Sequence, residues 1–212
     1  MVSPIEPTIS RWKKHWKSDF MEAVETFGIV IGAQKNEKLG GSDSFDIFTM
    51  DHGIMRWFSR SQSLVGVNCV FEDVKISGSR TTETAGNLHG MEILSKNSDA
   101  MRQNGSYEHG KTFIETMRKM VFDGIPMCGL FAITRQAIKN FASNFNADVV
   151  LLKALYLLCK EEGYAVDATW INSLSPTDKI FARGVIFLEF DCITFGHASA
   201  LIDSLRQWML SL

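Results

Sequence analysis

The hydrophobic periodicity of this chain changes near its middle, and the change limits the folds that it can adopt. Between residues 29 and 94, short apolar runs and alternating apolar and polar residues are separated by glycine-containing segments, which is typical of β-strands. Between residues 111 and 162, apolar residues recur every three to four positions, which is typical of helices. Because strands and helices are segregated rather than alternating, the pattern favours an α+β fold.

The strand patterns of the first half predict a small, mostly antiparallel sheet. The strongest pattern covers residues 64–76, and weaker ones cover residues 29–33, 45–49 and 88–94. Residues 78–90 are rich in serine, threonine and glycine and predict an exposed loop.

The second half predicts several helices that pack on this sheet. Residues 112–122, 130–143 and 147–162 have helical spacing, and the last of these has an apolar arc broad enough to be buried on two sides. Residues 164–170 predict a short strand.

Both ends of the chain carry additional patterns. An apolar stripe predicts a helix over residues 11–27, and it consists of Trp12, Trp16, Phe20, Val24 and Phe27. A strand followed by a helix is predicted over residues 183–210, because the apolar run that starts at Val185 gives way to helical spacing after Gly196. The sheet would therefore include a C-terminal strand.

Length and composition are those of one globular domain spanning residues 1–212. With 212 residues, of which 45% are hydrophobic, the chain can bury a sizeable core without a disulfide or a metal. Its net charge of −2 excludes a globally basic nucleic-acid binder but permits a local basic patch. The sequence has neither a secretory signal nor a run of eighteen apolar residues, so we expect a cytoplasmic protein that does not span a membrane.

No pattern of catalytic or metal-ligating residues stands out. The four cysteines, at positions 69, 128, 159 and 192, are dispersed among apolar neighbours and are expected to be free buried thiols. The five histidines are equally dispersed, and neither a nucleophile elbow nor a phosphate-binding loop is present. We therefore expect no cofactor and no metal ion, and these observations favour a protein that is not an enzyme.

Composition favours a binding or assembly protein that acts as a homo-oligomer. The chain contains 15 phenylalanines, 5 tryptophans and 10 methionines, residue types that are enriched at protein interfaces.

RNA binding is the first alternative. Trp12 and Trp16 could stack on bases if their stripe is exposed rather than docked on the sheet. The candidate nucleic-acid-binding residues are Trp12, Lys13, Lys14, Trp16, Lys17, Arg56 and Arg60. Paired tryptophans on an early helix with a strand–helix finish give an arrangement that resembles viral RNA-silencing suppressors. The resemblance implies that an RNA duplex is the ligand.

An enzyme is the second alternative. Its site would be built from the loops 35–44, 49–53 and 78–90, and it would require Asp51, His52 and His89 to line one pocket.

Overall fold

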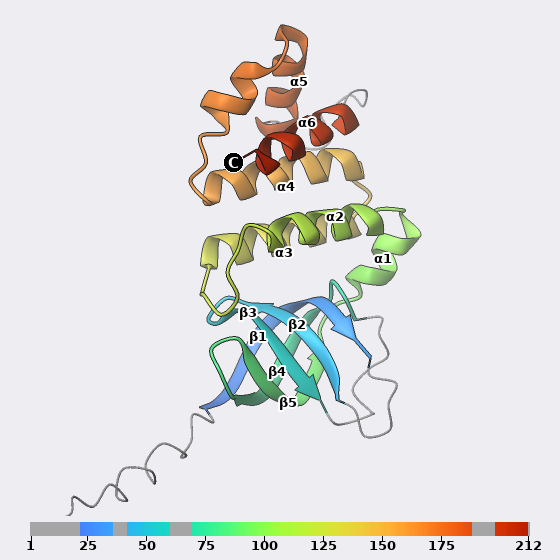
Figure 1. Cartoon of the computed structure of the whole chain (residues 1–212). Helices are drawn as coiled ribbons and strands as arrows, with labels where there is room; N and C mark the ends of the chain where they lie inside the picture. Colours follow the sequence, from blue (N-terminus) through green and yellow to red (C-terminus); the bar gives the residue numbers. More distant parts are fainter. Residues whose placement is uncertain (1–21, 36–41, 60–68, 188–197, 212) are drawn as a thin grey trace, which may run out of the picture.

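The computed structural model has a β-barrel at one end and stacked helices at the other (Figure 1). It describes residues 22–35, 42–59, 69–187 and 198–211. The α+β class predicted from the sequence is confirmed, with one sheet in the first half of the chain and helices in the second.

Five strands close into the barrel in the order β1-β2-β3-β5-β4, and β4 pairs back with β1. Their bounds are β1 (Glu22–Gln34), β2 (Asp43–Thr49), β3 (Gly53–Ser59), β4 (Asp73–Arg80) and β5 (Ala85–Ile93). Four of the pairings are antiparallel, whereas β3 and β5 are parallel.

Alternate side chains of these strands fill the barrel. Its core contains Val24, Val30, Phe45, Ile47, Met55, Trp57, Cys69, Val74, Ile76 and Leu88. The Trp57 side chain is the largest of these and lies against Gly78 and Gly86, where an added Cβ would come within 2.7 Å of the indole ring. Glycine is therefore required at both positions because the tryptophan occupies the space of a side chain.

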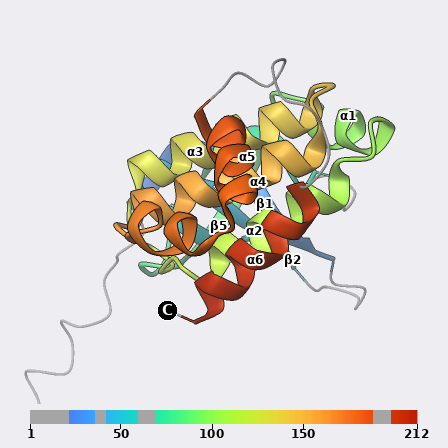
Figure 2. The same cartoon turned by 90° about the horizontal axis from the view of Figure 1, so that it is seen from above.

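The helices form layers above the barrel (Figure 1). Their bounds are α1 (Asn97–Gln103), α2 (Tyr107–Arg118), α3 (Cys128–Ala142), α4 (Ala147–Glu161), the π-helix η2 (Asp167–Ile171), α5 (Pro176–Phe187) and α6 (Ala198–Leu210). Helices α2 and α3 lie next to the barrel, α4 lies beyond them, and α5 and α6 cover α4 (Figure 2). Because α4 is enclosed between two layers, its apolar side chains are buried almost all round, which confirms the burial on two sides predicted for residues 147–162.

A second, larger core joins the helices to the outside of the barrel. The outward-facing side chains of Ile29 and Ile31 on β1, Phe48 on β2 and Ile54 on β3 belong to the helical core and not to the barrel interior. Gly53 has a φ of +67°, and an added Cβ there would lie 2.1 Å from the carbonyl oxygen of Ile125. The β2–β3 turn and the connection between α2 and α3 are therefore in close contact.

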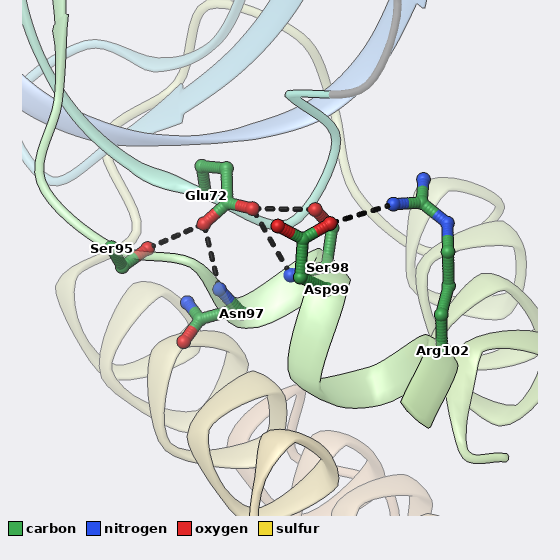
Figure 3. Close-up of polar contacts among 6 residues, drawn as sticks. All are labelled: Glu72, Ser95, Asn97, Ser98, Asp99 and Arg102. Carbon is green, nitrogen blue, oxygen red and sulfur yellow. Dashed lines mark hydrogen bonds and ion pairs between the residues drawn. The ribbon is translucent and has the colours of Figure 1, made fainter. Parts of the chain in front are cut away.

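Phe71 and Glu72, directly before β4, both point into the helical part. Phe71 has a φ of +77°, and its ring contacts Tyr107 edge-on at a centroid distance of 5.1 Å. The Glu72 carboxylate is almost completely buried and accepts hydrogen bonds from the backbone N–H groups of Asn97 and Ser98 at 2.7 and 3.0 Å (Figure 3). The hydroxyl groups of Ser95 and Ser98 donate to it as well. Glu72 thus satisfies the first N–H groups of α1 and balances its positive end.

The structure corrects the predicted N-terminal helix. Residues 22–27 belong to β1 and pair with β4, and their burial alternates with Val24 and Thr26 inside. The helical spacing of three residues between Val24 and Phe27 does not reflect a helix. Val24 points into the barrel and Phe27 lies on its outer face, as expected for a strand. Residues 11–21 lie outside the described part of the chain.

Predicted strands near the C-terminus are also wrong where they can be compared. Residues 183–187 belong to α5, in which Ala182, Val185 and Ile186 are buried at helical spacing. Residues 188–197 are not among those described. The segment 164–170 forms a turn and the start of η2, since Val166 and Trp170 are buried four residues apart.

Two predictions in the first half are wrong in part. Most of the predicted loop 78–90 belongs to β4 and β5, because its glycines accommodate Trp57. Only residues 81–84 connect the strands. Of the predicted strand 64–76, residues 73–76 are confirmed as part of β4, whereas residues 69–72 form the turn that contains Phe71. Residues 64–68 lie outside the described part of the chain.

Removal of the Glu72 carboxylate should weaken the attachment of the helices. Glu72→Ala is expected to lower the free energy of unfolding by about 2–4 kcal/mol, since buried N–H and hydroxyl donors lose their acceptor. Urea denaturation measures the change. Glu92→Ala on the exposed side of β5 is the control, with an expected change of at most about 0.5 kcal/mol. Equal effects of the two substitutions would contradict the anchoring role of Glu72.

Candidate nucleic-acid interface on the barrel

The outer face of β3 is only partly covered by the helices. Ile54, near its start, is buried in the helical core, whereas Arg56 and Phe58 further along the strand are exposed. Phe58 is 40% exposed, which is unusual for a phenylalanine in the middle of a sheet. The covered and uncovered halves of this face therefore differ in chemistry.

Polar neighbours surround the Phe58 ring. The strand register pairs Phe58 with Ser44 on β2 and with Asn87 on β5. Ser44 in turn pairs with Gln34 on β1. Since side chains at paired positions lie on the same face of a sheet, Phe58 is an aromatic side chain on an otherwise polar surface.

Asp46 of β2 holds two arginines beside this surface. It accepts hydrogen bonds from Arg56 Nε and Nη2 at 2.8 and 3.2 Å and from Arg118 Nη1 of α2 at 2.7 Å. Burial tends to raise the pKa of Asp46, but the hydrogen bonds and charges of the two arginines outweigh burial and hold this pKa below its usual value. The cluster of Asp46, Arg56 and Arg118 thus has two positive charges for one negative charge, and Arg56 remains 45% exposed.

The β4–β5 connection borders the face. The N–H group of Arg56 donates to the carbonyl oxygen of Thr84 in the β4–β5 connection at 2.9 Å, so this connection lies along β3. Lys35 follows the end of β1 and is exposed. The β1–β2 connection continues through residues 36–41, which lie outside the described part of the chain.

A separate apolar pocket of about 390 Å³ lies where the barrel meets α3. Its apolar lining comes from Phe27, Met50, Leu94 and Phe131, and its charged lining from Asp51, Asp73 and Arg135. Phe27 is 60% exposed there, and Met50 and Leu94 are exposed as well. Arg135 Nε donates to Asp73 Oδ1 at 2.9 Å, which links α3 to β4. We refer to this feature as the junction pocket.

Of the seven nucleic-acid-binding residues predicted from the sequence, the structure describes one. Arg56 lies on the exposed half of β3, whereas Trp12, Lys13, Lys14, Trp16, Lys17 and Arg60 lie outside the described ranges. The sequence analysis missed Phe58 and Arg118. Alternation of Arg56 and Phe58 with the buried Met55 and Trp57 was the signal that could have revealed Phe58. Nothing local in the sequence links Arg118 to Asp46.

The loop residues considered for catalysis do not converge. Asp51 and His52 lie in the turn before β3, where Asp51 Oδ2 accepts a hydrogen bond from Thr26. His89 lies two residues beyond Asn87, which pairs with Phe58 near the other end of β3. Asp51 lines the junction pocket, whose lining includes neither His52 nor His89, and His89 Nε2 instead lies 3.4 Å from Ser79 Oγ on β4. The predicted Asp/His pocket is therefore not formed.

Thiol and metal chemistry find little support within the described ranges. Burial raises the pKa of the Cys69 thiol to about 11 and that of the Cys159 thiol to about 12, so both are protonated at neutral pH. Cys128 is exposed, contrary to the prediction that all cysteines are buried. No three His, Cys, Asp or Glu side chains among the described residues are placed to hold a metal ion.

Comparison with known proteins gives no family assignment. No protein-family model matches the chain, and no curated protein matches it. No described helix has the length and apolar character needed to cross a bilayer. The strand order and the parallel β3–β5 pairing are nevertheless those of an OB-fold, a five-stranded Greek-key barrel.

Asp46→Asn should make stability less dependent on acid. We expect it to lower the free energy of unfolding at pH 7 by about 1–2 kcal/mol, because both arginines lose a charged acceptor. The folded-state pKa of Asp46 is lowered, so its contribution is present above the unfolded value of about 4 and is lost as the pH falls through the folded-state pKa. Urea denaturation at several pH values should therefore show a difference from the wild type that shrinks below about pH 4.

The exposed Asp99, which pairs with Arg102 on α1, provides the matched control. Asp99→Asn is expected to change the free energy of unfolding by at most about 0.5 kcal/mol at any of these pH values. A difference for Asp46→Asn that persists unchanged in acid would show that the charge of Asp46 is not what stabilises the cluster.

Proposed function

We propose that this protein is a non-enzymatic binding protein whose barrel binds single-stranded nucleic acid on the exposed half of its β2–β3 face. The observation that carries the proposal is the exposed Phe58 ring next to Arg56, on a strand face that is otherwise polar.

The chemistry of this face matches that of an unpaired strand. A phenylalanine ring offers a surface on which a base of any sequence can stack. Arg56 and Arg118 offer guanidinium groups to phosphates, and Asp46 fixes their positions in advance. A duplex hides the faces of its bases, so the stacking surface favours single strands over the duplex implied by the sequence-based resemblance.

Barrel topology supports the same ligand class. In OB-folds, the face of β2 and β3 and the β1–β2 and β4–β5 connections bind oligonucleotides and oligosaccharides. Fold alone does not establish function, and the arginine cluster is what favours a ligand with phosphates over a neutral sugar. The net charge of −2 implies binding through a local patch, with affinity that falls as salt rises.

Phe58→Ala should weaken binding without affecting the fold. A fluorescein-labelled oligothymidylate or oligouridylate of about 12 nucleotides suits a single barrel of this type. Loss of one stacking contact of 1–3 kcal/mol corresponds to roughly a 5- to 150-fold increase in Kd, measured by fluorescence anisotropy at low salt. Phe187→Ala on α5, which removes another exposed phenylalanine in the outermost helical layer, should leave Kd unchanged. Wild-type protein that binds neither oligonucleotide would contradict the proposal.

A second candidate function is self-association through the junction pocket, in keeping with the homo-oligomer expected from composition. Exposed Phe27, Met50 and Leu94 gather there, and apolar patches of this kind mark interaction sites. Asp51 and Arg135 line the same pocket. A two-fold contact joins the same surface of both copies, so charged side chains within it pair best when both signs of charge lie on that surface.

Phe27→Glu should disrupt such a dimer. Light scattering at increasing protein concentration is expected to give twice the chain mass for the wild type and a single chain mass for the variant, because the carboxylate would be buried against an apolar partner. Phe187→Glu, at another exposed phenylalanine, should leave the mass unchanged. A wild-type protein that stays monomeric, or a Phe27→Glu protein that still dimerises, would rule out this interface.

A further inference from the structure

The geometry points to a second stacking residue in the same site, Phe122, which the helical part of the chain contributes. This inference rests on the proposed binding of single-stranded nucleic acid. It makes the site composite, with Phe58 supplied by β3 and Phe122 supplied by the connection between α2 and α3, residues 119–127.

Backbone contacts hold this connection against the barrel. The N–H group of Gly124 donates to the carbonyl oxygen of Ile54 on β3 at 2.8 Å. Gly124 has a φ of +76°, and an added Cβ there would lie 2.6 Å from the carbonyl oxygen of Glu83 in the β4–β5 connection. The connection therefore lies in the corner between β3 and the β4–β5 connection, and Figure 1 shows it descending from the helices to the barrel beside β3.

Charge interaction places Asp123, the residue after Phe122, near the arginine cluster. Asp123 is close enough to Arg56 that its charge helps to raise the Arg56 pKa. Arg118, at the end of α2, reaches Asp46 from the same helix that leads into this connection. Phe58 thus lies two residues from Arg56 on the same face of β3, and Phe122 directly precedes the residue whose charge acts on Arg56.

Phe122 is 74% exposed, the largest exposure among the described phenylalanines. An apolar ring at a loop tip costs free energy in water, and here the backbone on either side is fixed by α2 and by Gly124. A ring on a backbone that is fixed before binding loses less freedom when a base stacks on it than a ring on a mobile segment does. Lys119 and Arg118 add positive charge on the α2 side, while Asp123 opposes it on the other.

The test uses the full chain and the labelled oligothymidylate and oligouridylate of about 12 nucleotides that suit one barrel. Phe122→Ala is expected to raise Kd by roughly 5-fold or more, the effect of losing one stacked base. Phe122→Trp should restore or strengthen binding, because the larger ring also stacks. Phe187→Ala is the control for removing an exposed ring. Urea denaturation should show unchanged stability for the two Phe122 variants and a modest loss for Phe187→Ala, because the Phe187 ring contacts Tyr156 edge-on.

The outcomes separate this inference from the proposed function. If Phe58→Ala weakens binding but Phe122→Ala does not, the barrel binds nucleic acid alone and the composite site is wrong. If Phe122→Ala weakens binding and Phe122→Trp does not restore it, the ring acts by something other than stacking, and the inference is also overturned. If the wild type binds no oligonucleotide, the proposed function itself fails.

Discussion

The attachment of α1 to the barrel depends on one short turn, where Phe71 and Glu72 leave the barrel together. Consecutive side chains of a strand point to opposite faces, yet both of these reach the helical part. The left-handed backbone at Phe71 makes this possible, at a cost of about 1 kcal/mol for a residue with a side chain. Burial of the ring and the four hydrogen bonds to the Glu72 carboxylate offset that cost.

The helices divide the β2–β3 face into two halves with different roles. Where the helices cover the face, the outward residues are Phe48 on β2 and Ile54 on β3, next to Ile29 on β1. All three side chains are apolar and are buried in the helical core. Where the cover ends, the strand continues with Arg56 and Phe58. A barrel with five short strands has a small core, and the outer apolar residues enlarge the buried surface by packing under the helices. The exposed half is then what the helices leave available for a ligand.

Local patterns predicted the class of fold and most of the helices, but they did not predict the closure of the sheet. Helix α4 could be read from its spacing because its burial depends on its own sequence. The barrel depends on long-range pairing, and its glycines at 78 and 86 looked like loop residues until Trp57 was placed beside them. Continuous apolar runs such as the one from Val185 fit a strand or a buried helix equally well. Among the described residues of the proposed site, the sequence analysis had named only Arg56. Phe58 could not be found in this way, because the register that places it between Ser44 and Asn87 exists only in the folded barrel.

Asp46 connects the two halves of the face, and so it links stability to binding. Its carboxylate ties α2 to the barrel through Arg118 and at the same time orients Arg56 toward the exposed half. A negative charge on a surface proposed to bind phosphates is unfavourable in itself, but without it two guanidinium groups would lie close together unbalanced. Asp46 reduces that repulsion, and Arg56 keeps the guanidinium donors that do not bond to the carboxylate. The position of Phe122 follows from the same contact, because the connection that carries it begins where Arg118 fixes the end of α2. One buried carboxylate on β2 therefore fixes Arg56 in the proposed site and anchors the helix that leads into the connection beside it.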